Sequence, residues 1–193
     1  PRFEVYPSNV FRVIQLMILG FLAEGPLHGY DLRQRMERLQ GSTKPMSDGT
    51  LYPAIDRLER SGYVTRTEQA GARAATRHTL EISDLGHEVL LRRLRTASGG
   101  EITDLRRFRV ILAFLSLLPD RAERDAVLRR RLDYLDQPAS FFYDGDTPLP
   151  AAAITDPYRR GMLLSARALS SAERAWIREE LASADGPAEE VAS

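Results

Sequence analysis

The sequence predicts a mostly helical α+β protein: an N-terminal winged helix-turn-helix with a two-stranded wing, followed by an all-α C-terminal domain. Three observations support this class. Apolar residues recur at helical spacing up to about residue 61, two short strand-like runs follow between residues 63 and 82, and the second half shows helical patterns only. Because the strands are confined to one place, helices must supply most of the core.

Three helices are predicted in the first third of the chain. They cover residues from 8 or 9 to 24, about 29–39, and roughly 47–61. The start of the third helix stays open between two alternatives. A start at Ser47 would place Pro53 inside the helix, where proline loses a hydrogen bond and crowds the preceding turn, whereas a start near Thr50 avoids this conflict.

A β-hairpin and a fourth helix follow. The candidate strands are residues 63–69 and 76–82, joined by small residues that suit a mobile tip. Ser83-Asp84 then forms a typical N-cap, and Ser98-Gly99-Gly100 interrupts the pattern. We therefore predict a winged-helix domain over residues 1–98.

The second half is predicted to be entirely helical. One helix covers residues 102–118, a second starts after Asp120, and Asp156-Pro157 opens a long last helix. Residues 137–153 carry three prolines and three consecutive aromatic residues, and are predicted to be a connector. We expect residues 99–184 to form a dimerisation and effector domain and residues 185–193 to be a frayed tail.

Three motifs mark the N-terminal half, in a fixed order. They are Gly25-Pro26-Leu27-His28-Gly29-Tyr30, Gly49-Thr50-Leu51-Tyr52-Pro53 and Leu58-Glu59-Arg60-Ser61-Gly62-Tyr63. Together they resemble the winged-helix domain of the PadR family of transcriptional regulators, over about residues 10–95. One departure concerns the wing, because Leu80-Glu81-Ile82-Ser83 stands where the family usually has Tyr-x-Leu-Thr.

The third helix is the candidate DNA reader. Leu51, Ile55 and Leu58 share one face and should enter the core, which leaves the opposite face for base edges in the major groove. The resemblance implies that Tyr52 bonds to the DNA backbone, although it could instead pack between the second and third helices. The predicted DNA-binding residues are Lys44, Ser47, Gly49, Thr50, Tyr52, Pro53, Arg57, Arg73 and Arg77.

A single winged helix contacts few bases, so we expect a homodimer that reads a palindrome. Aromatic residues of the second half are candidates for the dimer interface or for a pocket that holds a small aromatic effector. Ordinary core packing is the alternative for those at helical spacing. The candidates are Phe108, Phe114, Phe142, Tyr143 and Trp176.

Composition sets further limits. The chain has no cysteine, and its 43% apolar and 28% charged residues are ordinary for a globular protein. No apolar run approaches the roughly 18 residues of a membrane span, and no secretory leader is recognised. We therefore expect a cytoplasmic protein with no membrane partner.

No catalytic motif is found, and the three histidines are not at metal-ligand spacing. We expect no enzyme activity, no metal and no cofactor. The predicted function is sequence-specific binding of double-stranded DNA by an effector-released repressor. Residues 1–100 hold 14 basic and 11 acidic residues, a weak excess for a DNA-binding protein. Two alternatives therefore stay open: a protein–protein interaction module, and a small-molecule-binding protein without DNA function.

Overall fold

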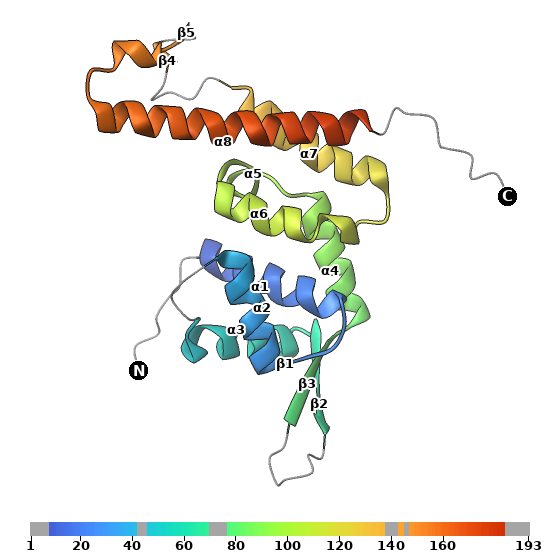
Figure 1. Cartoon of the computed structure of the whole chain (residues 1–193). Helices are drawn as coiled ribbons and strands as arrows, with labels where there is room; N and C mark the ends of the chain where they lie inside the picture. The colour runs from blue at the N-terminus through green and yellow to red at the C-terminus, as the bar shows by residue number, and fades with distance from the viewer. Residues whose placement is uncertain (1–7, 42–45, 70–76, 138–142, 145–146, 184–193) are drawn as a thin grey trace, which may run out of the picture. The chain divides into compact units, whose positions relative to one another are not determined.

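The computed structural model describes residues 8–41, 46–69, 77–137, 143–144 and 147–183. The chain divides into two compact units, residues 1–120 (unit 1) and residues 121–193 (unit 2). Each unit is described by itself (Figure 1). Among the residues described, no helix is both long enough and apolar enough to cross a membrane.

Unit 1 is built around its first helix. Figure 1 shows this helix inside the unit, where it contacts α2, α3, α4, α6 and β3. Its side chains from Ile14 to Leu22 are largely buried, as expected of a helix that is apolar on nearly all sides. The elements of unit 1 are α1 (Ser8–Ala23), β1 (Leu27–His28), α2 (Gly29–Gln40), α3 (Asp48–Arg60), β2 (Val64–Gln69), β3 (Arg77–Ile82), α4 (Asp84–Arg95), α5 (Gly100–Thr103), α6 (Leu105–Ala113) and the 3-10 helix η1 (Leu115–Leu117).

The sheet of unit 1 has one strand more than the predicted wing. Strands β2 and β3 form the antiparallel hairpin, with Val64 opposite Ile82, and β1 pairs with the other edge of β3. The extra strand has only two residues, too few to show the alternation that predicts a strand. Its pairing of Leu27 with Leu80 fixes the start of α2 to the wing.

The structure settles where α3 begins. The helix starts at Asp48 with Ser47 as N-cap, so Pro53 lies inside it. The backbone N–H groups of Thr50 and Leu51 both donate to the carbonyl of Ser47, at 2.9 and 3.2 Å. Because proline has no N–H group, the carbonyl four residues earlier, at Gly49, receives no bond from it. The earlier of the two predicted starts is therefore close to the observed one.

The capping prediction for α4 is confirmed. The hydroxyl of Ser83 accepts from the backbone N–H of Gly86 at 3.0 Å and donates to the carbonyl of Gly62. The same serine therefore ends the hairpin and starts the helix.

The predicted helix over residues 102–118 is interrupted. Asp104 separates α5 from α6 and caps the second of them, since its carboxylate accepts from the backbone N–H of Arg107 at 3.0 Å. Upstream, Arg93 of α4 donates through two nitrogens to Glu101 of α5 at 3.0 and 3.2 Å. Burial lowers the pKa of Arg93, and the nearby Glu101 opposes that shift.

Helix α6 packs on α1, which moves the structural boundary. The rings of Phe21 and Phe114 meet edge to face, with centroids 5.0 Å apart. Phe108 and Phe114 are both buried in the core of unit 1, so the core interpretation applies to these two predicted interface residues. The compact unit thus runs to Asp120, whereas the sequence places a boundary after residue 98.

The described residues of unit 2 form two α-helices, one 3-10 helix and a short hairpin. Its elements are α7 (Arg121–Leu135), β4 (Tyr143–Asp144), β5 (Thr147–Pro148), the 3-10 helix η3 (Ala151–Ala153) and α8 (Pro157–Ala182). As predicted, the carboxylate of Asp156 caps the last helix, accepting from the N–H groups of Tyr158 and Arg159. A bidentate ion pair between Arg131 and Glu173, at 2.8 and 2.9 Å, joins α7 to α8. The predicted class, mostly helical with a small antiparallel sheet, is confirmed.

Candidate nucleic-acid interface

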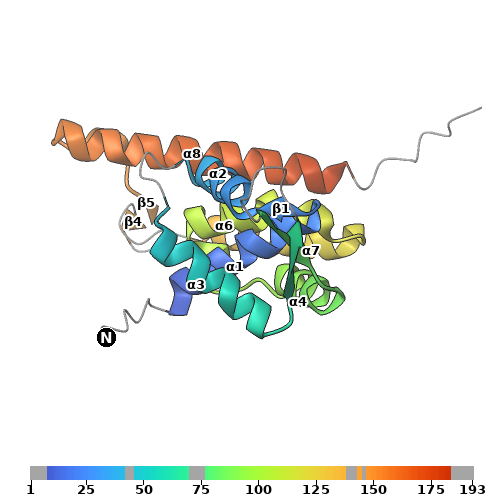
Figure 2. The same cartoon turned by 90° about the horizontal axis from the view of Figure 1, so that it is seen from below.

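Helix α3 has one buried and one exposed face, as the sequence predicts. Leu51, Ile55 and Leu58 are each 1% exposed or less and anchor the helix to the core. On the opposite side, Pro53 and Arg57 are exposed. Viewed from below, α3 lies in front of α1 on this face of unit 1 (Figure 2).

Tyr52 has the packing role that the sequence left open, and its contact with DNA stays a prediction. Its ring lies against the start of α2, where a Cβ added to Gly29 would be 3.5 Å from ring atom Cε1 and 3.7 Å from the hydroxyl. Yet 45% of Tyr52 is exposed. The residue therefore packs between α2 and α3 and still presents a surface to a partner.

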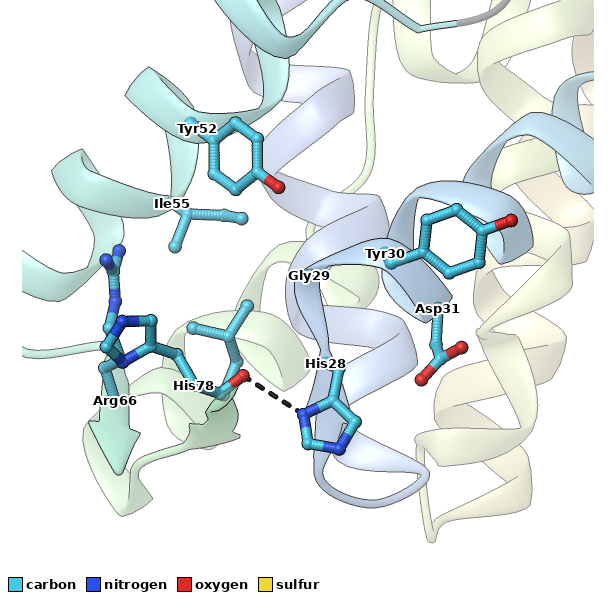
Figure 3. Close-up of a pocket in the computed structure, with 9 residues that line it drawn as sticks. His28, Gly29, Tyr30, Asp31, Tyr52, Ile55, Arg66 and His78 are labelled. Carbon is cyan, nitrogen blue, oxygen red and sulfur yellow. Dashed lines mark hydrogen bonds between the residues drawn. The ribbon is translucent and has the colours of Figure 1, made fainter. Parts of the chain in front are cut away.

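A hollow of about 380 Å³ opens beside Tyr52, between α3, the start of α2 and the sheet (Figure 3). Its lining contains both polar and aromatic groups. Nδ1 of His28 lies 3.2 Å from the carbonyl oxygen of His78, which ties β1 to β3. On its rim, 58% of Tyr30 is exposed. The Tyr30 hydroxyl accepts a hydrogen bond from Gln34 at 2.7 Å.

Acidic side chains of α3 are paired with arginines from other elements. Arg66 of β2 reaches Asp56 at 2.9 Å and Glu59 at 3.1 Å, and Arg33 of α2 reaches Asp48 at 2.7 Å. These pairs partly neutralise the carboxylates next to the exposed face, where unpaired acids would repel phosphate. Arg66 on the wing strand therefore has an intramolecular role, in ion pairs with α3.

The predicted DNA-binding residues fall into two groups. Ser47, Gly49, Thr50, Tyr52, Pro53 and Arg57 come together at the first two turns and on the outer face of α3. No atom lies within 4 Å of the place that a Cβ of Gly49 would take, so a backbone could approach there. Arg77 is the first residue of β3, opposite Gln69. Lys44 and Arg73 lie outside the described residues.

Two residues of this surface escaped prediction, Tyr30 and Arg33. Tyr30 ends the first motif and lies on the rim of the hollow, and the guanidinium of Arg33 lies 5.7 Å from the centre of its ring. An aromatic residue directly after the motif glycine was the available signal for Tyr30. Nothing in the sequence pairs Arg33 with Asp48.

This arrangement, a two-faced helix between a capped turn and a hairpin, coincides with a family match. Residues 18–92 match the family model described as "Transcriptional regulator PadR-like family". The resemblance inferred from the three motifs is thereby confirmed.

Two curated relatives match part of the chain. An uncharacterized 37.1 kDa protein in transposon TN4556 of Streptomyces fradiae is 39% identical over 57 residues, which are 30% of this chain and 16% of that protein. The transcriptional regulator YqjI of Escherichia coli is 36% identical over 61 residues, 31% of this chain and 29% of that protein. The matches thus span less than a third of either relative.

Solved structures similar to the chain include the Bacillus subtilis PadR in complex with operator DNA. That structure has a TM-score of 0.44 and 21% identity, with 92% of this chain and 99% of that chain covered. A transcriptional regulator from Clostridium thermocellum has a TM-score of 0.40 and 26% identity, covering 45% and 84%. Because both scores lie below 0.5, the fold assignment rests on the helices and strands described above.

The predicted residues of the second half lie in different environments. Trp176 is 42% exposed on α8, and Tyr143 lies in β4. Phe142 lies outside the described residues. Within the described part of the chain, no group of three or more histidine, aspartate or glutamate side chains could hold a metal ion.

Proposed function

We propose that the protein is a transcriptional regulator that binds a specific sequence of double-stranded DNA through the exposed face of α3. The observation that carries the proposal is the two-sided character of this helix within a PadR-like segment. Its inner face is buried, and Tyr52, Pro53 and Arg57 face outward. The N-terminal turns of such a helix can reach base edges in the major groove.

Backbone contacts would surround this face. The first turn of a helix attracts phosphate, and Ser47, Gly49 and Thr50 lie at the start of α3. Arg77, at the end of the hairpin far from the Val64–Ile82 pair, belongs to the proposed wing contacts together with Arg73, and Lys44 to the contacts of the preceding turn. In this proposal phosphate contacts position the protein, and the outer face of α3 reads sequence.

The proposal includes a homodimer and a palindromic operator. An exposed apolar stripe along α8 supports this step. Its members are spaced by 4, 7 and 7 residues and are 42–88% exposed: Tyr158, Met162, Leu169 and Trp176. The neighbouring side of the helix is buried through Leu163 and Ile177. A stripe with this heptad-like spacing suits a second helix of the same kind.

Repression and release by an effector complete the proposal. A small aromatic effector bound near the aromatic residues of unit 2 would change the spacing of the two α3 helices and so release the operator. The protein would act in the cytoplasm, next to the DNA that it regulates.

The test is fluorescence anisotropy of the full chain on a labelled duplex from upstream of its own gene, against a scrambled duplex, at two salt concentrations. Specific binding should be tighter on the first duplex and should weaken steeply with salt. Tyr52→Ala and Arg57→Ala should each weaken binding about 10- to 100-fold, as expected for groups worth roughly 1–3 kcal/mol. Arg92→Ala, an exposed arginine of α4, is the matched control.

Binding that ignores sequence, or mutants that bind like the wild type, would contradict the proposal. The weak basic excess of the first 100 residues then favours a protein–protein interaction module. Size-exclusion chromatography with light scattering tests the dimer separately. Substitutions in the apolar stripe of α8 should lower the molar mass from that of a dimer to that of a monomer, and should leave the fold of unit 1 unchanged.

A further inference from the structure

A second hollow of unit 1 lies away from the face of α3. It measures about 490 Å³ and lies between α1, the C-terminal end of α2 and α6. Both α3 and α6 contact α1, and the two views place them on opposite sides of that helix (Figures 1 and 2). A duplex docked on α3 would therefore not cover this hollow.

One side of the hollow is strongly cationic. Arg106, Arg107 and Arg109 of α6 all line it, and no carboxylate does so among the described residues. The guanidinium of Arg107 lies over Gly100, where an added Cβ would be 2.6 Å from Nη1. Gly100 therefore leaves room for Arg107 in this position.

These three arginines differ from other arginines of unit 1. Arg33, Arg66 and Arg93 each meet a carboxylate within 3.0 Å. For the three arginines of the hollow, the described part of the chain supplies no side-chain hydrogen bond and no ion pair. Three like charges within about one turn of the same helix repel each other, so a bound anion would be favoured here.

The rest of the hollow is partly apolar. Val13 of α1, Leu39 of α2 and Val110 of α6 contribute to the lining. Arginine binds carboxylate, sulfonate and phosphate groups through paired N–H donors, while apolar side chains favour the carbon skeleton of a ligand. The volume is within the range of sites for small molecules, about 300–1,000 Å³.

We propose that this hollow binds a small organic anion with an apolar body, held by Arg106 and Arg109 at its charged end. The two side chains are exposed and can turn toward a ligand, whereas Arg107 is held nearer to Gly100. This inference goes beyond DNA binding and does not depend on it, because ligand binding can be measured without DNA.

The probe is 8-anilinonaphthalene-1-sulfonate, which joins an anionic sulfonate to an aromatic body. Its fluorescence is titrated with the full chain, and N-phenyl-1-naphthylamine, which has the same rings without the sulfonate, is the matched neutral probe. The double variant Arg106→Gln/Arg109→Gln should bind the anionic probe about tenfold or more weakly, since charge-assisted hydrogen bonds are lost. Its affinity for the neutral probe should stay the same.

Arg38→Gln/Arg92→Gln, which removes the same charge from exposed positions outside the hollow, should leave both affinities unchanged. Circular dichroism should show that both double variants keep the wild-type helix content. Equal affinity of Arg106→Gln/Arg109→Gln and wild type for the anionic probe would overturn the proposal, as would an equal loss in the control variant. The proposal would also be overturned if Arg106→Gln/Arg109→Gln kept its affinity for the anionic probe but no longer bound duplex DNA. That result would assign the two arginines to nucleic-acid binding.

Discussion

Replacing Gly20 with alanine tests the packing that joins α6 to α1. An added Cβ at Gly20 would lie 2.6–2.7 Å from Cγ, Cδ1 and Cδ2 of Phe114. These atoms form the root of the ring, next to its Cβ, so rotation of the ring cannot remove the overlap. Relief requires a shift of α6, and Phe114 is only 1% exposed within the core.

Two opposing effects set the size of the change. Alanine stabilises a helix interior by about 0.8–1.0 kcal/mol relative to glycine. Overfilling a packed core costs about 1–3 kcal/mol, and we expect the upper part of that range because three atoms overlap. The net expectation for Gly20→Ala is a loss of about 1–2 kcal/mol, which lowers the melting temperature of a 100-residue unit by about 5–10 °C.

Thermal and urea unfolding followed by circular dichroism measures this change. Gly161→Ala is the matched control, because an added Cβ within α8 would meet no atom within 4 Å and should stabilise slightly. Combining Gly20→Ala with Phe114→Leu should give less destabilisation than the sum of the single changes, since both act on one contact. A Gly20→Ala variant that melts at or above the wild-type temperature would refute the reasoning.

Two further substitutions probe other contacts. Gly86→Ala should destabilise unit 1 by about 3 kcal/mol, because the new Cβ would overlap the backbone carbonyl of Tyr63, which cannot rotate away; urea unfolding at wild-type stability would show that the backbone adapts. Arg131→Met should destabilise unit 2 by about 2–4 kcal/mol by leaving the carboxylate of Glu173 half-buried without its partner. Adding Glu173→Leu to this variant should recover most of the lost free energy of unfolding. A double variant that is as unstable as Arg131→Met alone would contradict the ion-pair explanation.

Local signals predicted several elements of both units. The caps at Ser83 and Asp156 appear in the structure as expected, because a cap depends on a few consecutive residues. The outward face of α3 followed from helical periodicity alone, since Leu51, Ile55 and Leu58 had to share the core. Motifs and periodicity therefore identified both the fold class and the face of the candidate interface.

Contacts between distant segments could not be predicted in this way. The apolar pattern after residue 102 predicts a helix, but not that α6 packs on α1 and takes Phe108 and Phe114 into that core. Likewise, a two-residue strand such as β1 forms only because β3 offers an open edge. From the sequence, the exposed arginines of α6 are indistinguishable from ordinary solvated surface charge. Only the fold shows that they line a hollow together with Val13 and Leu39.

The bridge from Arg66 to Asp56 and Glu59 limits how this protein can be re-engineered. A specificity swap that grafts a foreign α3 onto this scaffold would separate the guanidinium of β2 from its two carboxylates. A grafted helix without those two acids would leave Arg66 without its carboxylate partners. Conversely, α3 moved into another protein would bring the unpaired carboxylates of Asp56 and Glu59 close to the DNA phosphates. Helix and strand therefore form the smallest exchangeable cassette, and chimeras should be cut before residue 47 and after residue 69.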